Sequence, residues 1–257
     1  MIVLAIGATG SIGRHVVAEA LAAGHTVRAL VRDRARADFP ASVDVVVGDV
    51  TNPETVAAAV HGVDAVVFTH GSDGGGKVGS RTVDYGAVRN VLAALDRPVR
   101  IALMTAIGVT NRMGAYNQST ESHDWKRRAE RLVRASGHEY TIVRPGWFDD
   151  NAADQLRLVF QQGDSQGGTS SSPADGVISR RQIAQVLVSS LTSESARHKT
   201  LELVAETGTA QTDLEPLFAA LEADPAGSLD GGADVDNQPL AEEPESVRAD
   251  LAAIRQP

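Results

Sequence analysis

Three evenly spaced glycines near the start of the chain give the clearest chemical signal in the sequence. The stretch GATGSIG, residues 7–13, directly follows a run of apolar residues and leads directly into an amphipathic stretch. Glycine permits a tight turn and close approach of a diphosphate, and the free N–H groups of a helix N-terminus attract the anion. The spacing therefore predicts a dinucleotide site made by Gly7, Thr9, Gly10, Ser11, Ile12 and Gly13.

The residues after the second apolar run indicate which nicotinamide cofactor is bound. The run TVRALV ends in Arg32-Asp33-Arg34, and Arg32 lies nineteen residues after Gly13. An arginine here suits the 2′-phosphate of NADP, whereas an acidic residue suits the free ribose hydroxyls of NAD. We therefore predict NADP in preference to NAD, with Arg32 as a ligand and Asp33 as the alternative ribose ligand.

A second glycine-rich stretch, VVFTHGSDGGGKV at residues 66–78, resembles a nucleoside triphosphate loop. Gly71 and Gly76-Lys77 satisfy most of the pattern, but valine stands at position 78, where Ser or Thr is needed to hold Mg²⁺. The next helical pattern starts only near Thr82. We therefore predict a flexible loop beside the nicotinamide half of the cofactor, with Lys77 either exposed or facing an anionic substrate.

The order of β-branched runs and amphipathic stretches predicts the fold that positions these loops. Continuous apolar strands alternating with helices form a parallel sheet with helices on both faces. We predict an α/β, doubly wound Rossmann-type sheet followed by an irregular C-terminal section on the substrate side. The predicted strands are Ile2–Ile6, Thr26–Val31, Val43–Val47, Ala65–Phe68, Arg100–Met104, Thr141–Val143 and Thr200–Val204. The predicted helices are Ser11–Ala23, Pro53–Val60, Thr82–Leu95, Ser122–Ala135 and Arg181–Leu191.

We expect a single NAD(P)-binding domain over residues 1–257. Residues 1–145 form its dinucleotide-binding core, and residues 146–257 form a smaller substrate-side and C-terminal section. The late stretches 161–176 and 222–239 are rich in turn-forming residues and predict long loops, the second between short helices at 212–221 and 244–255.

Composition excludes several classes of function. The chain of 257 residues contains no cysteine, which excludes disulfides, thiolate metal sites and cysteine nucleophiles. No apolar run approaches the ~20 residues that span a bilayer, and the N-terminus has no basic leader. We expect a cytoplasmic protein that binds a small-molecule substrate but no metal, membrane or nucleic acid. Its oligomeric state stays open.

The net charge of −9 is concentrated in the C-terminal section. From Ala205 onward the chain has twelve Asp or Glu residues against only two arginines. We interpret this section as a solvated, partly irregular surface. Arginines at positions 127, 128, 131 and 134 are interpreted as a solvated helix face, with Glu130 available to pair with Arg127 or Arg134.

Motifs spread over residues 1–205 resemble one family. They are GATGSIG, GDVTN (48–52), VVFTHGS (66–72), VDYGAVRNVLAAL (83–95), DWKRRAERLVRASGHEYTIVRPGWF (124–148) and ISRRQIAQVLVSSL (178–191). Together they resemble the atypical short-chain dehydrogenases/reductases, most closely the NmrA-like, NAD(P)-binding branch of reductases and epimerases.

The resemblance implies contacts along the whole length of the cofactor. By position, Asp49 and Val50 contact the adenine, the first by its side chain and the second by its backbone. Thr69, His70 and Gly71 run past the ribose and diphosphate on the nicotinamide side.

The resemblance also implies the residues around the reacting ring. Lys126 matches the lysine of the family's Tyr-x-x-x-Lys pair, which holds the nicotinamide ribose. Pro145 and Gly146 line the nicotinamide pocket, and Trp147 and Phe148 open towards the substrate.

The chain departs from the family at the tyrosine of that pair, which is the general acid. The position four before Lys126 is Ser122, whose hydroxyl is too weak an acid to replace a phenol. Two alternative proton donors lie near Lys126. His123 shares its helix face, and Tyr116 lies in a loop that could fold over the site. Thr105, after the fifth predicted strand, stands near the place of the family's serine.

Three functions fit these observations. The first is an NADPH-dependent reductase of a carbonyl, a quinone or an activated alkene, for which a strong general acid is not essential. The second is a non-catalytic NADP(H)-binding redox sensor or regulator, which the missing tyrosine favours. The third is a nucleotide-sugar epimerase or dehydratase. An enzyme should leave an apolar cavity near Trp147, whereas a sensor should fill it.

Overall fold

The chain folds into an alternation of strands and helices. The computed structural model describes residues 1–72, 74–164 and 172–254. Its strands are β1 (Ile2–Ile6), β2 (Thr26–Val31), β3 (Asp44–Val47), β4 (Ala65–Phe68), β5 (Arg100–Met104), β6 (Glu139–Pro145), β7 (Trp147–Phe148), β8 (Arg157–Gln161), β9 (Val177–Ile178) and β10 (Lys199–Glu206). Its α-helices are α1 (Gly13–Ala22), α2 (Pro53–Val60), α3 (Gly76–Gly79), α4 (Gly86–Ala94), α5 (Ala115–Thr120), α6 (Ser122–Ala135), α7 (Arg180–Ser190), α8 (Glu215–Ala219) and α9 (Glu245–Ile254). Single 3₁₀ turns are η1 (Arg34–Arg36), η3 (Pro173–Asp175) and η4 (Leu240–Glu242), and η2 (Ser80–Tyr85) is a π-helical segment between α3 and α4.

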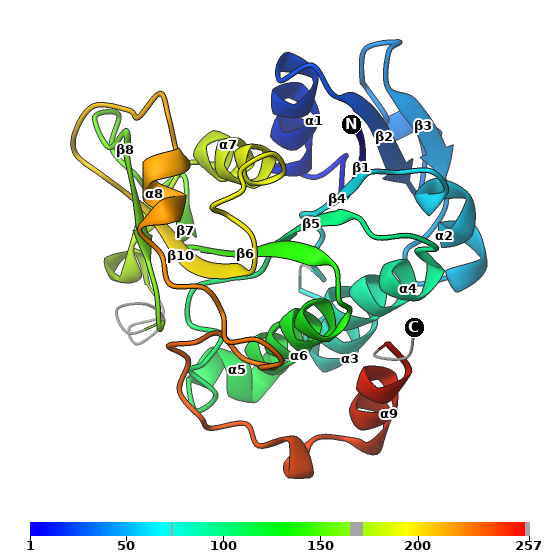
Figure 1. Ribbon diagram of the computed structural model, residues 1–257, viewed down its shortest axis with the longest axis vertical. Helices are drawn as coiled ribbons and strands as arrows, with labels where there is room; N and C mark the ends of the chain where they lie inside the picture. Colours follow the sequence, from blue (N-terminus) through cyan, green and yellow to red (C-terminus); the bar gives the residue numbers. More distant parts are fainter. Residues whose placement is uncertain (73, 165–171, 255–257) are drawn as a thin grey trace.

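Eight strands form one sheet in the order β3-β2-β1-β4-β5-β6-β10-β8 (Figure 1). Neighbouring strands are parallel except for β8, which runs antiparallel to β10. The first six strands follow the 3-2-1-4-5-6 order of the doubly wound dinucleotide-binding fold. The predicted fold class is therefore confirmed, with one antiparallel edge strand added. A separate parallel pair, β7 with β9, stands beside the sheet.

One strand of the main sheet was not predicted, and one helix begins earlier than predicted. Strand β8 was not predicted, because its ladder partner lies over forty residues later, where Phe160 pairs with Leu203. The helix expected from Thr82 begins at Gly76 instead. Glycine is a poor helix former, so helix propensity does not predict a start at Gly76. Glycine fits position 79 because a Cβ there would lie only 3.0 Å from the Cβ of Ser72.

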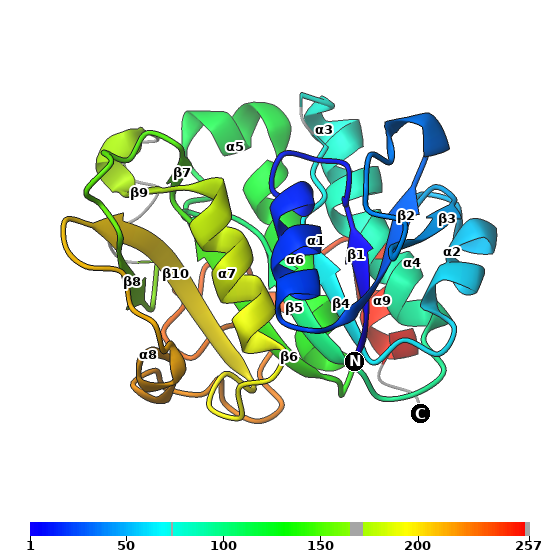
Figure 2. The same ribbon diagram turned by 90° about the horizontal axis from the view of Figure 1, so that it is seen from above.

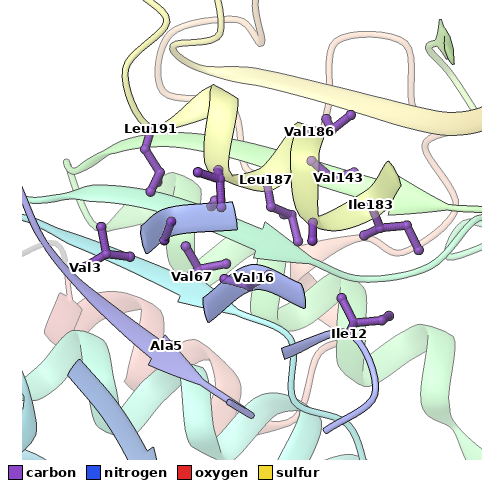
Figure 3. Close-up of a cluster of buried hydrophobic side chains, with 14 of the residues drawn as sticks. Val3, Ala5, Ile12, Val16, Val67, Val143, Ile183, Val186, Leu187 and Leu191 are labelled. Atoms are coloured by element: carbon purple, nitrogen blue, oxygen red, sulfur yellow. The ribbon is translucent and has the colours of Figure 1, made fainter. Parts of the chain in front are cut away.

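Helices cover both faces of the sheet and enclose two apolar layers. Helices α1 and α7 lie side by side on one face, while α2, α4, α6 and α9 cover the other (Figure 2). Figure 3 shows the first layer, in which Val16 of α1 and Leu187 of α7 pack over strand residues such as Val67. No helix in the described ranges is long and apolar enough to cross a membrane.

The irregular segment 223–243 lies across α6 and buries its arginines. Arg127 and Arg131 each contact Asp230, at 2.9 and 2.7 Å. Arg128 and Arg131 each contact Glu243, at 2.6 and 2.7 Å. The prediction of a solvated arginine face is therefore wrong, and so is the interpretation of these carboxylates as solvated. Partners such as Arg127 and Asp230 stand 103 positions apart, beyond the reach of a helix pattern.

A buried ion network continues from α6 into the sheet. Arg144 contacts Glu130 at 2.7 Å, Glu202 at 3.1 Å and Asp234 at 2.6 Å, and Arg134 contacts Glu130 at 3.3 Å. All five side chains are buried. Burial raises the pKa of Glu202 to about 7. Burial also opposes ionisation of Asp234, but the hydrogen bonds and charge of Arg144 hold its pKa at about 2.

Candidate functional site

A cleft of about 1180 Å³ opens along the carboxyl edge of the parallel strands. Loops that follow β1 to β6 line it, which is where doubly wound sheets bind their ligands. Of the predicted site residues, Gly13 and the two alternatives Asp33 and Lys77 do not line it, and the others do: Gly7, Thr9, Gly10, Ser11, Ile12, Arg32, Asp49, Val50, Thr69, His70, Gly71, Tyr116, His123, Lys126, Pro145, Trp147 and Phe148.

The glycine loop has the shape that a diphosphate requires. Gly7 has a positive φ of 84°, and a Cβ there would lie 2.8 Å from the backbone nitrogen of His70. A Cβ on Gly13 would lie 2.0 Å from the carbonyl oxygen of Gly7, so Gly13 packs behind the loop instead of lining the cleft. Helix α1 starts with Ile12 at its N-cap, and no side chain caps it, so its N-terminus is open to an anion.

The part of the cleft beside the end of β2 carries positive charge, because Arg32 and Arg36 line it. The side chain of Asp33 accepts a hydrogen bond from the backbone nitrogen of Ala35 at 2.9 Å and so caps η1. Asp49 accepts hydrogen bonds from Thr51, and these bonds, helped by the charge of Arg32, hold its pKa below the ordinary value although burial opposes them.

The loop after β4 forms one wall of the cleft. Thr69 donates its hydroxyl to the carbonyl of Ile6, 3.1 Å away, which ties this loop to the end of β1. Burial lowers the pKa of His70 to about 4, although the charge of Asp84 opposes the shift, so its imidazole is neutral at pH 7. Its Nδ1 is buried and has no hydrogen-bond partner within the described part of the chain.

Lys126 is held by a carboxylate that the sequence analysis did not identify. Its Nζ lies 2.7 Å from Oδ1 of Asp84, whose side chain is fully buried. Asp84 also accepts hydrogen bonds from the hydroxyl and the backbone nitrogen of Ser72, at 2.7 and 3.1 Å. Asp84 belongs to the π-helical segment η2, a distortion that often marks functional sites. The ammonium group is therefore fixed in place, with its charge balanced.

Helices α5 and α6 bring the two candidate proton donors together. The rings of Tyr116 and His123 lie 5.5 Å apart, and both line the cleft with Lys126. Burial lowers the pKa of His123, which favours its neutral imidazole. Ser122 is buried at the cleft, as its position implies. Thr105 also lines the cleft, but its hydroxyl donates to Glu130 at 2.7 Å.

The segment after β6 exposes two aromatic rings to the cleft. Strand β7 pairs with β9, so Trp147 lies opposite Val177. A Cβ on Gly146 would lie 2.4 Å from the carbonyl oxygen of Gly176, so glycine is needed for the two strands to meet. Trp147 is 41% exposed and Phe148 is 37% exposed, which leaves an open apolar rim.

Two basic residues differ from the prediction: Arg180, which was not predicted, lines the cleft, and Lys77 does not. Arg180, the first residue of α7, lines the cleft and contacts Ser11, 169 positions away. Lys77 pairs with Glu121 at 2.9 Å and does not line the cleft, so it does not face a substrate there. Of the predicted flexible loop, position 73 lies outside the described residues, and 76–79 form α3. Within the described ranges, no three His, Asp or Glu side chains cluster to hold a metal ion.

Comparison with known proteins agrees with this geometry. The profile of an NAD(P)H-binding family matches residues 7–194. The chain is 30% identical over 215 residues to an uncharacterised sugar epimerase of Bacillus subtilis, covering 79% of this chain and 94% of the relative. It is 35% identical over 173 residues to the chloroplastic divinyl chlorophyllide a 8-vinyl-reductase of Zea mays, covering 61% of this chain but only 43% of that protein.

A solved structure extends the similarity to the fold. An anaerobillin reductase from Escherichia coli O157:H7 superposes with a TM-score of 0.61 at 23% identity, covering 82% of this chain and 100% of that one. At this identity the likeness concerns the fold alone. The matched profile spans more than half of the chain and shows, together with the glycine loop, that the chain belongs to the NAD(P)H-binding family.

Proposed function

We propose that the protein is an NADPH-dependent reductase of a planar carbonyl compound, quinone or activated alkene. The observation that carries this proposal is the open apolar rim beside the nicotinamide end of the cleft. Trp147 and Phe148 remain partly exposed there, and Tyr116 is 52% exposed. A cleft of about 1180 Å³ exceeds the usual range for one small ligand and has room for a cofactor and a second molecule.

In this proposal, two parts of the chain bind the cofactor and the substrate. Residues 1–145 supply the cofactor site, and the section from 146 onward supplies the apolar side that faces the substrate. When bound, the cofactor supplies the hydride. The protein then orients the acceptor between the aromatic rings and excludes water. Lys126, fixed by Asp84, holds the ribose next to the reacting ring.

Proton delivery falls to Tyr116 in this proposal. The lowered pKa of His123 leaves a neutral imidazole, which is a poor acid but can hydrogen-bond a phenol. A phenol is a weak acid, which suits acceptors that accumulate little charge. Quinones and conjugated alkenes fit this condition better than simple ketones.

The preference for NADP over NAD rests on the arginines in the part of the cleft beside the end of β2. Arg32 and Arg36 line it, while the side chain of Asp33 is engaged in capping η1. A guanidinium group binds a phosphate through two parallel hydrogen bonds. Arg32→Gln should therefore weaken NADPH binding about tenfold and leave NADH binding within about twofold of the unchanged protein.

A second candidate is a non-catalytic NADP(H) sensor. Ser122 at the tyrosine position favours it. Two observations count against it: the rim near Trp147 is open, and several carboxylates of the acidic C-terminal section are engaged inside the molecule with the arginines of α6. A nucleotide-sugar epimerase or dehydratase is a third candidate. The Bacillus subtilis relative is named as a sugar epimerase, but the serine at 122 disfavours this class.

The reductase proposal is tested at the rim. With any acceptor that the protein reduces, Trp147→Ala should raise KM for the acceptor about tenfold while KM for NADPH stays unchanged. Leu240→Ala serves as the matched control, since this side chain is also exposed, at 43%, but lies outside the cleft lining. Equal effects of the two substitutions would contradict the assignment of the rim to the substrate.

A further inference from the structure

Arg180 occupies a position between the glycine loop and the substrate-side segment. Its Nε donates to the hydroxyl of Ser11 at 3.0 Å. Its Nη1 pairs with the carboxylate of Asp149, and its guanidinium lies 5.4 Å from the centre of the Phe148 ring. The side chain is 32% exposed and lines the cleft. None of the roles given above uses this residue.

Helix packing fixes this position. Helices α1 and α7 are neighbours on the same face of the sheet, and Ile12 and Ile183 belong to the same apolar layer (Figure 3). Each helix begins just after a segment at the carboxyl edge of the sheet, so both N-termini open on the cleft. The first residue of α7 therefore lies against the loop that precedes α1. Ser179 fixes the start of α7 through a capping box with Gln182.

Ser11 connects Arg180 to the cofactor. It belongs to the glycine loop, whose shape and uncapped helix start fit a diphosphate. A guanidinium group within hydrogen-bond reach of that hydroxyl is also within reach of an anion bound on the same loop. Arginine is suited to this because its planar fork donates two parallel hydrogen bonds to phosphate oxygens.

We propose that Arg180 is a ligand of the cofactor diphosphate and adds a guanidinium group to the anion site of the glycine loop. Its hydrogen bond to Ser11 holds the guanidinium ready, and a phosphate oxygen takes the place of the hydroxyl. The same side chain contacts Asp149 and Phe148, so it joins the cofactor site to the substrate rim. The proposal rests on NAD(P)H binding by the family and does not depend on the reductase activity proposed above.

A purely structural role is the alternative to exclude. In that case Arg180 would only pair with Asp149, which also accepts a hydrogen bond from the backbone nitrogen of residue 180 at 3.0 Å. Asp149→Asn separates the two roles. It retains an acceptor for the backbone nitrogen but removes the negative charge next to the guanidinium. If Arg180 binds the diphosphate, Asp149→Asn should leave the affinity for the cofactor unchanged or raise it. If Arg180 only anchors Asp149, Asp149→Asn should weaken cofactor binding.

The experiment is calorimetric titration of the purified protein with NADP⁺, NAD⁺ and ADP-ribose, without any acceptor. Arg180→Gln should raise Kd for all three by about tenfold, because all three contain the diphosphate. The control is Arg181→Gln, since Arg181 is the adjacent residue, is 69% exposed and pairs with Glu19. It should change Kd by less than about twofold.

Three results would overturn the proposal. The first is an unchanged Kd for ADP-ribose in Arg180→Gln. The second is a loss of affinity in Asp149→Asn equal to that in Arg180→Gln. The third is a loss of affinity of the same size in the control Arg181→Gln. If Arg180→Gln does not fold, Arg180→Lys replaces it. Lysine keeps the charge but not the fork, so an affinity equal to that of the unchanged protein would contradict the proposal. Because the readout is binding, absence of reductase turnover would leave these outcomes interpretable.

Discussion

The cofactor cleft and the ion network under segment 223–243 use the same side-chain types in opposite ways. In the network, Arg144 is fully buried and contacts Glu130, Glu202 and Asp234. In the cleft, Arg32 and Arg36 line an open surface. A buried arginine that is paired with carboxylates on all sides stabilises a single conformation. A partly exposed arginine retains N–H groups that can donate hydrogen bonds to a ligand. The difference distinguishes a structural charge cluster from a binding site.

The largest effect is expected where the network loses its central cation. Arg144→Met leaves three buried carboxylates around the lost charge, and we expect the free energy of unfolding to fall by about 4 kcal/mol. Arg157→Met is the control, because its pair with Glu206 is half exposed and should contribute less than about 1 kcal/mol. Urea unfolding of both variants measures the difference. Similar losses would break the contrast between buried and exposed pairs.

The next effect concerns the glycine loop of the cleft. Gly13→Ala puts a Cβ 2.0 Å from the carbonyl oxygen of Gly7, which must displace the loop, whereas Gly10→Ala meets the same oxygen at 3.1 Å. We expect Gly13→Ala to weaken NADPH binding about 100-fold, roughly 3 kcal/mol, and Gly10→Ala to weaken it less. Fluorescence titration with NADPH compares the two. A greater loss for Gly10→Ala would contradict the packing role of Gly13.

The pH dependence of the free energy of unfolding should distinguish Glu202 from the other carboxylates of the network. Burial raises its pKa from 4.5 to about 7, so the folded state binds this proton more tightly than the unfolded chain does. This group's contribution to stability is therefore fully present below about pH 4.5 and is lost as pH rises through 7. Glu202→Gln mimics the protonated form and should be more stable than the unchanged protein by roughly 2 kcal/mol at pH 8.

The control for this pH dependence is the same comparison at acid pH. Thermal unfolding of both proteins at pH 5 and pH 8 should show the advantage of Glu202→Gln only at pH 8. Asp234 behaves in the opposite way, since its pKa of about 2 gives stability that is lost only as pH falls below about 4. An advantage of Glu202→Gln that is equal at both pH values would exclude titration of Glu202 as its cause.

The smallest effect is expected at Asp84, where a buried carboxylate serves the cleft. Asp84→Asn should release the ammonium of Lys126 and raise Kd for NADPH about fivefold to tenfold. Kd for ADP should not change, because ADP lacks the nicotinamide ribose. Asp250→Asn is the matched control, since Asp250 accepts a hydrogen bond from Tyr85 away from the cleft lining. Equal losses for ADP and NADPH would show that Asp84 acts on the fold alone.

The sequence predicted the cleft better than the network, for a physical reason. The glycine loop is a local pattern, because strand, turn and helix start fall within a few consecutive residues, and parallel strands bring the other loops to the same edge. The partners in the network are far apart in sequence, as with Arg127 and Asp230. Asp84 was missed for the same reason, since Lys126 lies 42 positions from it. Late strands such as β8 were missed because their pairing is also long-range.

In our proposal, this open cleft carries out NADPH-dependent reduction. The measurement that tests it most directly is NADPH oxidation by the purified protein across a panel of quinones, enones and aldehydes, with NADH run alongside. We expect turnover with NADPH, faster with quinones or enones than with simple aldehydes, and weak use of NADH. Tight NADPH binding without turnover on any acceptor would contradict it and favour the sensor.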